Sequence, residues 1–203
     1  MALDSAGRAQ NPGRVTLRNW GATPEEVSAW MPGDDLCPEA RFVETRCIDL
    51  QSCPAAVFPW LVQMGFGRAG WYSYDLLDNL GRRSSQHIVD KWQRMQAGDT
   101  VPGGPISFTA VVVNAPHEFV IALDAKGRLT RRIGFTLSYV LRPTGHGTRL
   151  VTRARIKVDL PFGRVLERLI LGPGDGLMVR KQLRGIARRT TTCLLYTSDA
   201  ADD

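Results

Sequence analysis

The chain has 203 residues, of which 43% are hydrophobic and 23% charged, and this ordinary globular composition excludes a collagen, a coiled coil or a wholly disordered chain. The length suits one domain with an extension, and no uncharged apolar run approaches the roughly 18 residues of a membrane-spanning helix. The formal net charge of +6 makes the chain basic, so anionic partners have to be considered.

Residues 1–40 are rich in glycine, proline and charge, and we expect them to form an extended arm laid on the domain. Within the arm, Thr23-Pro24-Glu25-Glu26 predicts a short helix, because threonine caps the helix, proline takes its first position and acids fill its first turn. Trp20 and Trp30 are the expected anchors of the arm. The first residues contain no apolar run typical of a secretory signal, so a cytoplasmic location is expected.

The next part of the chain is predicted to contain one strand and two short helices. Residues 41–50 alternate as a strand does, and Ser52-Cys53-Pro54 then opens a helix that Gly65 ends. Residues 72–80 predict a second helix, and residues 82–105 are expected to be irregular. The apolar stripe of the first helix comprises Ala56, Val57, Trp60, Leu61 and Met64, and that of the second comprises Leu76, Leu77 and Leu80.

Four antiparallel strands are predicted next, at residues 106–114, 119–123, 132–142 and 149–158. The last strand has apolar residues on one face and basic residues on the other, which indicates a half-buried sheet. A long C-terminal helical region follows, interrupted at 172–176 and stopping at 190–192. Because strands and helices are segregated along the chain, the fold class is α+β.

The last eleven residues, 193–203, resemble the in-frame translation of a sequencing adapter, and we expect them not to be native. The alternative is a genuine disordered tail. Without the three acids of this segment, the net charge rises from +6 to +9. The predicted organisation is therefore an N-terminal arm (1–40), a folded domain (41–192) and a non-native tail (193–203).

Five segments of the chain together resemble one family: Trp20-Gly-Ala-Thr-Pro-Glu-Glu26, Pro32-Gly-Asp-Asp-Leu36, Pro59-Trp-Leu-Val-Gln-Met-Gly65, Trp71-Tyr-Ser-Tyr-Asp75 and Gln182-Leu-Arg-Gly-Ile186. The chain resembles uncharacterised bacterial members of the SRPBCC, or START-like, superfamily, which also contains polyketide cyclases and lipid-transfer domains. The resemblance implies a helix-grip fold, in which a curved antiparallel sheet wraps around a long C-terminal helix and leaves an internal cavity. It supplies no catalytic residues. Two departures stand out: Cys53 replaces an expected proline, and Gly176 an expected bulky residue.

Several motifs point to ordinary structural roles. Gly65-Phe-Gly-Arg-Ala-Gly70 matches a dinucleotide-binding fingerprint, but it follows a helix rather than a strand, so a glycine-rich loop is the better interpretation. Cys37, Cys47 and Cys53 have neither zinc-site nor disulfide spacing and are expected to be reduced thiols. His117 and His146 fall in predicted turns. No metal site and no cofactor is predicted.

Aromatic and acidic residues gather directly after this loop, and they are the candidate site. Tyrosine and tryptophan combine an apolar body with a polar tip, which suits a pocket for an amphipathic ligand, and an acid among them can act in proton transfer. The alternative is that the rings simply pack and the acid caps a helix or pairs with an arginine. The catalytic candidates are Asp75, Tyr72, Tyr74 and His87, and the predicted ligand-binding residues are Trp60, Trp71, Tyr72, Asp75, Phe108, Phe135, Tyr139 and Met178.

Basic residues form two groups, on the strands and on the last helix. They suit an anionic lipid surface or nucleic acid, or else a solvated sheet face with cations near a helix C-terminus. No nucleic-acid motif is present, so we expect no nucleic-acid partner and only a transient membrane-surface contact. The strand group is Arg131, Arg132, Arg149, Arg153, Arg155 and Lys157, and the helix group is Arg180, Lys181, Arg184, Arg188 and Arg189.

Three functions therefore remain open. The main hypothesis is binding of a small hydrophobic or amphipathic molecule, such as a lipid, a polyketide or an aromatic metabolite, in the cavity between sheet and helix. The second is a cyclase or dehydratase acting on a polyketide-like substrate, which needs only a shaped cavity and one or two acid–base groups. The third is a protein-interaction module whose core is filled. The sequence does not predict an oligomeric state.

Overall fold

The computed structural model describes residues 19–124, 132–160 and 172–199. The first half contains helix α1 (Pro24–Ser28), the 3-10 turn η2 (Asp34–Leu36), strand β1 (Phe42–Leu50), helices α2 (Pro54–Val62) and α3 (Asp75–Asp78), and the 3-10 turn η3 (Asp90–Trp92). The second half contains strands β2 (Thr100–Pro102), β3 (Ser107–Asn114), β4 (Glu118–Leu123), β5 (Ile133–Thr144) and β6 (Gly147–Val158), and helix α5 (Gly172–Asp199).

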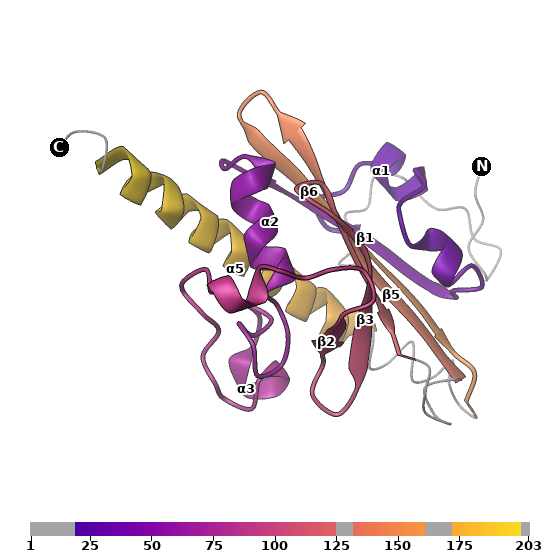
Figure 1. Cartoon of the computed structure of the whole chain (residues 1–203). Helices are drawn as coiled ribbons and strands as arrows, with labels where there is room; N and C mark the ends of the chain where they lie inside the picture. Colours follow the sequence, from indigo (N-terminus) through magenta and orange to yellow (C-terminus); the bar gives the residue numbers. More distant parts are fainter. Residues whose placement is uncertain (1–18, 125–131, 161–171, 200–203) are drawn as a thin grey trace.

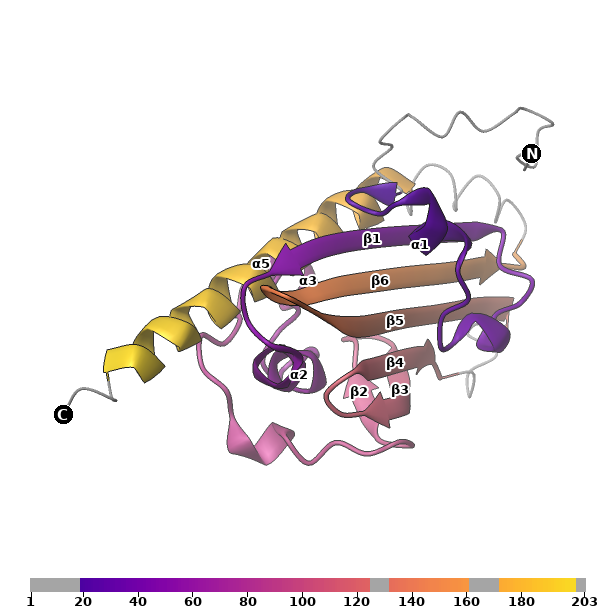
Figure 2. The same ribbon diagram turned by 90° about the horizontal axis from the view of Figure 1, so that it is seen from above.

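The six strands form one antiparallel sheet in the order β1-β6-β5-β4-β3-β2. Figure 1 shows the curved sheet with α2, α3 and α5 on one face, which we call the inner face, and α1 with η2 on the outer face. Figure 2 shows α5 running obliquely to the long strands. The predicted α+β class and the sheet packed against a C-terminal helix are confirmed.

Three predicted elements differ from the structure. The segment expected to be irregular contains the short strand β2, which pairs with β3. Helix α3 is only four residues long, and its leucines are 70–78% exposed rather than forming a packed stripe. Helix α5 begins at Gly172 and continues to Asp199, because Pro173 falls in its first turn, where a missing N–H costs little. The expected start of this helical region, at residues 161–171, lies outside the described residues.

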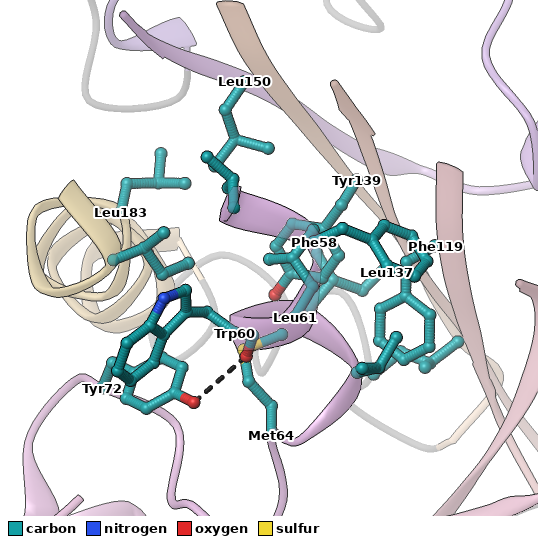
Figure 3. Packing of buried hydrophobic residues seen from close by; sticks show 14 of the residues in the cluster. Phe58, Trp60, Leu61, Met64, Tyr72, Phe119, Leu137, Tyr139, Leu150 and Leu183 are labelled. Carbon is teal, nitrogen blue, oxygen red and sulfur yellow. Dashed lines mark hydrogen bonds between the residues drawn. The ribbon is translucent and has the colours of Figure 1, made fainter. Parts of the chain in front are cut away.

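Helix α2 supplies the centre of the core on the inner face. Cys53 is its N-cap and Pro54 its first residue, as the sequence predicts. Val57 and Leu61 are fully buried, and Leu183 and Ile186 of α5 are equally inaccessible. Figure 3 shows that the side chains of α2 lie between the sheet and α5. The core therefore fixes α5 relative to the sheet and so fixes the space between them.

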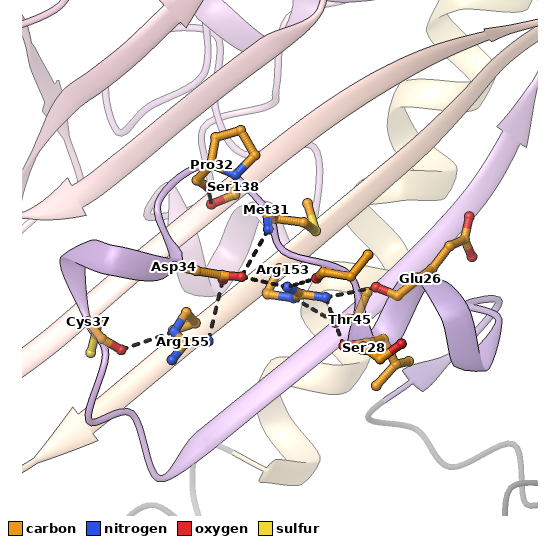
Figure 4. A network of polar contacts seen from close by, with 12 residues as sticks. Glu26, Ser28, Met31, Pro32, Asp34, Cys37, Thr45, Ser138, Arg153 and Arg155 are labelled. Carbon is orange, nitrogen blue, oxygen red and sulfur yellow. Dashed lines mark hydrogen bonds and ion pairs between the residues drawn. The ribbon is translucent and has the colours of Figure 1, made fainter.

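The arm covers the outer face, and Arg153 of β6 holds it there (Figure 4). The guanidinium of Arg153 donates to the carbonyls of Glu26, Val27 and Ala29 over 2.7–2.9 Å, and to Asp34 Oδ2 over 2.8 Å. Its Nε donates to Thr45 Oγ1 over 3.0 Å, so all five N–H groups are used. The basic face of β6 is consequently covered by residues of the arm around Arg153, rather than fully solvated.

Arg149 and Arg155 of β6 also contact the arm. Arg149 pairs with Glu26 at 2.7 Å, and this hydrogen-bonded pair lowers the pKa of Glu26 to about 2. Arg155 contacts Asp34 at 3.4 Å. Trp30 is 64% exposed, so its expected role as an anchor is wrong, and the neighbouring Met31, 1% exposed, is the buried residue. The predicted role of Trp20 as an anchor is confirmed, because Trp20 packs against the core.

The arm also reaches the free edge of β1. The backbone N–H of Cys47 donates to the Trp20 carbonyl over 3.0 Å, and the N–H of Thr45 donates to Asn19 Oδ1 over 3.4 Å. At the opposite edge, β2 is only three residues long and ends in Pro102. The arm therefore occupies the middle of the β1 edge, and the opposite edge is short.

Candidate functional site

A cavity of about 180 Å³ lies between α5 and the inner face of the sheet, and we call it the inner cavity. An engineered cavity of about 150 Å³ is enough to hold benzene, so this space fits one substituted aromatic ring. Its lining is mainly apolar and comes from the 71–78 segment, the sheet and α5. The lining residues are Trp71, Ser73, Asp78, Gly103, Phe108, Ile121, Phe135, Leu137, Met178, Val179 and Gln182.

Three aromatic rings form one wall of the inner cavity. Trp71 packs edge-on against Phe108 at a centroid distance of 6.0 Å, and Phe108 lies 5.4 Å from Phe135. Gly103 allows this approach, because a Cβ there would lie 2.4 Å from the Phe108 ring. A wall of this kind favours flat apolar ligands.

Two of the polar side chains that line the inner cavity have hydrogen-bond partners within the protein, and a third has no side-chain partner. Ser73 Oγ donates to the Met178 carbonyl over 2.9 Å, and Gln182 Oε1 accepts from the Tyr139 hydroxyl over 2.9 Å. Asp78 is different, because both of its carboxylate oxygens are buried and no described side chain hydrogen-bonds to them. A ligand group that hydrogen-bonds or pairs with a carboxylate would meet Asp78 first.

The surroundings of Asp78 make its carboxyl less acidic than usual. Burial raises its pKa to about 6, and the negative charge of Asp75 adds to this effect. Nearby backbone N–H groups and the ammonium of Lys181 offset part of the increase. Asp78 can therefore exchange a proton near neutral pH, as general acid–base catalysis requires.

The structure divides the predicted ligand-binding residues into two groups. Trp71, Phe108, Phe135 and Met178 line the inner cavity. Trp60, Tyr72 and Tyr139 belong to the buried core beside it. Trp60 and Tyr72 pack edge-on at 5.9 Å, and the Tyr72 hydroxyl donates to the Trp60 carbonyl over 3.1 Å (Figure 3). Burial raises the pKa of Tyr72, which makes its phenol a poor proton donor to a ligand.

The remaining candidates lie away from the lining. Asp75 accepts a 2.5 Å hydrogen bond from Ser84 Oγ, so its carboxylate is engaged. The ring of Tyr74 lies under the Lys181 ammonium at 3.7 Å, and His87 is exposed. Asp78 is the acid that sequence reasoning missed. The signal available was its position three residues after Asp75, on the same predicted helix.

A second hollow, of about 360 Å³, adjoins the inner cavity, and we call it the outer groove. Its lining includes exposed leucines of the α3 region and residues that follow β2. It shares Trp71, Asp78 and Gly103 with the inner cavity. The predicted glycine-rich loop contributes Phe66, and its ends, Gly65 and Gly70, pair with each other rather than opening a helix. The full lining is Phe66, Trp71, Leu77, Asp78, Leu80, Gly103, Gly104 and Pro105.

The described residues contain neither a metal-binding cluster nor a membrane-spanning helix. No three His, Cys, Asp or Glu side chains in the described ranges gather closely enough to hold a metal ion. Among the helices of the same ranges, none combines the length and apolarity needed to cross a bilayer. Cys37 and Cys47 are buried free thiols, and Cys53 is an exposed one.

No family model and no curated protein matches this chain. Among solved structures, it is similar to a protein from Mesorhizobium loti, with 12% identity, a TM-score of 0.46, and coverage of 74% of this chain and 97% of that one. Norcoclaurine synthase from Thalictrum flavum is similar with 13% identity, a TM-score of 0.42, and coverage of 74% and 94%. The di-domain aromatase/cyclase StfQ of the steffimycin pathway is similar with 9% identity, a TM-score of 0.49, and coverage of 75% and 51%. At these values the likeness concerns the fold alone, and function has to be argued from the residues of this chain.

Proposed function

We propose that the protein binds a small hydrophobic or amphipathic molecule in the inner cavity. The observation that carries this proposal is a cavity of about 180 Å³ with an aromatic wall, which is also lined by Asp78, a residue whose carboxylate oxygens are buried. An apolar, aromatic lining with a few polar side chains is typical of a small-molecule binding site.

Filling the inner cavity tests the proposal. Saturation-transfer NMR with 4-methylphenol on the full chain is expected to show binding to the wild-type protein. Val179→Phe places a ring into the lining and is expected to abolish that signal. Val43→Phe is the matched control, since Val43 is 38% exposed and lies on the outer face. Binding that survives Val179→Phe in a folded protein would reject the inner cavity as the site.

Acid–base catalysis on a ketone-containing substrate is the second candidate function, and it is favoured by the pKa of about 6 at Asp78. In this function the Asp78 carboxylate takes a proton from the carbon next to a carbonyl and returns it to another position, as a cyclase or dehydratase requires. Deuterium uptake by 2-tetralone in D₂O measures this step directly. The wild-type protein is expected to accelerate uptake and Asp78→Asn to lose the acceleration, whereas equal rates would reject the role.

A further inference from the structure

The inner cavity and the outer groove meet at Asp78. Trp71, Asp78 and Gly103 line both spaces, so an occupant of one touches the boundary of the other. Alone, the inner cavity of about 180 Å³ is smaller than the roughly 300–1,000 Å³ typical of small-molecule sites, but the outer groove adds about 360 Å³. The two spaces together have the size of a site for one elongated ligand.

The charge at the boundary is negative. Both Asp78 oxygens are buried, and no described side chain hydrogen-bonds to them. Asp75, one helical turn earlier, adds a second acid, while the Lys181 ammonium lies over the Tyr74 ring. A buried carboxylate that no side chain pairs with is unfavourable, and a ligand cation with N–H donors would relieve that cost.

The outer groove is apolar and open. Leu77 is 70% exposed and Leu80 is 77% exposed, and both line the groove together with Phe66. Large apolar side chains that remain in water at a pocket rim gain free energy when a ligand covers them. An aliphatic chain leaving the inner cavity past Asp78 would cover both leucines.

From these observations we propose that the protein recognises an arylalkylamine whose aromatic ring fills the inner cavity, whose ammonium pairs with Asp78 and whose aliphatic chain lies along the outer groove. This inference rests on the proposed binding function and names its ligand class. Ring, charge and chain are each assigned to a different part of the site, so each can be removed separately.

Three probes separate these contributions in isothermal titration calorimetry of the full chain at pH 7.5. N-hexylbenzylamine carries ring, ammonium and chain, benzyl hexyl ether lacks the charge, and benzylamine lacks the chain. The wild-type protein is expected to bind N-hexylbenzylamine about tenfold more tightly than either of the other two, because each lost contact is worth about one decade of affinity.

Matched variants identify the residues responsible. Asp78→Asn is expected to remove the preference for the amine over the ether, whereas Asp75→Asn, whose carboxylate is bonded to Ser84, is expected to retain it. Leu80→Ser is expected to weaken both hexyl probes and leave benzylamine unchanged. Leu76→Ser is its control, because Leu76 of the neighbouring helix α3 is 78% exposed, as Leu80 is 77% exposed, but does not line the groove.

The outcomes distinguish this inference from the function on which it rests. Equal wild-type affinities for the amine and the ether would overturn the inference while leaving aromatic binding in the inner cavity intact. An amine preference that persists in Asp78→Asn would also overturn it. Failure of all three probes, together with failure of 4-methylphenol, would reject the proposed function itself.

Discussion

Tyr139 of β5 and Gln182 of α5 are joined by a hydrogen bond of 2.9 Å, in which the phenolic hydroxyl donates to the amide oxygen. Both side chains are buried. Gln182 also lines the inner cavity, and its Nε2 lies 3.6 Å from Met64 Sδ. This bond ties the sheet to the C-terminal helix directly beside the candidate site.

Removing the Tyr139 hydroxyl is expected to destabilise the protein. Tyr139→Phe leaves the buried Gln182 oxygen without its donor, which costs about 1–3 kcal/mol of unfolding free energy. Urea denaturation measures the loss. In the double variant Tyr139→Phe/Gln182→Leu, neither polar group remains. It is therefore expected to lose less unfolding free energy than the sum of the losses in the two single variants. Losses that simply add up would contradict the hydrogen bond.

Asp78 is expected to make the protein less stable as the pH rises. Its pKa is about 6 in the folded protein against an ordinary value of 3.8, so between these values the folded state holds more protons than the unfolded state. The contribution of Asp78 to the free energy of unfolding is therefore fully present below pH 4 and is lost as the pH rises through 6. Asp78→Asn is expected to be about 1 kcal/mol more stable than the wild type at pH 7.5, after allowance for solvent screening, and to lose that advantage at pH 4.

The difference between wild type and variant is the quantity to measure, by thermal unfolding at several pH values. Glu26 acts in the opposite direction, because its pKa of about 2 lies below its ordinary value and its contribution is lost as the pH falls. Subtracting the Asp78→Asn curve removes this background. A constant difference across the range would show that Asp78 does not titrate as described.

Gly185 marks the closest approach of α5 to the segment before α3. A Cβ at this position would lie 2.4 Å from the Tyr72 carbonyl oxygen, so Gly185→Ala has to shift the helix or the loop. We expect a destabilisation of about 1–3 kcal/mol, although alanine favours helices. Gly145→Ala makes the same chemical change where nothing lies within 4 Å, and its stability is expected to stay near wild type in the same denaturation assay.

Arg153 is expected to hold the arm in place. Arg153→Met leaves three backbone carbonyls of the arm without this donor and removes one of the donors to Asp34, at a cost of about 3 kcal/mol. Hydrogen exchange should accelerate in residues 19–40 before it does so in β4 and β5. Lys157→Met removes only a more exposed ion pair with Glu39 of the arm and is expected to accelerate this exchange less than Arg153→Met does.

Local patterns predict much of this fold. The alternation in β5 and β6 and the capping signal before α1 involve neighbouring residues only, and the strands and the helix form where those patterns lie. Burial depends on distant segments. The sequence indicates that Leu76, Leu77 and Leu80 share one side, but nothing local shows that this side is uncovered.

The candidate site was only partly accessible to sequence reasoning for the same reason. Aromatic residues after the glycine-rich loop indicated a pocket, yet which ring faces the cavity depends on the backbone at Tyr72, which has a positive φ of 59°. The choice between Asp75 and Asp78 depends on Ser84, which bonds one of them and leaves the other to the cavity. Arg153 looked like a solvent-facing residue because its partners lie more than 100 positions away.

The hydrogen bonds from Cys47 to the Trp20 carbonyl and from Thr45 to Asn19 have a consequence for the behaviour of this protein at high concentration. Exposed strand edges recruit strands from other molecules, and natural sheets avoid this by covering the edge or keeping it short. Here the arm bonds to part of the β1 edge, and the strand at the other edge has only three residues and ends in Pro102. Detachment of the arm would therefore expose the β1 edge as a template for edge-to-edge aggregation.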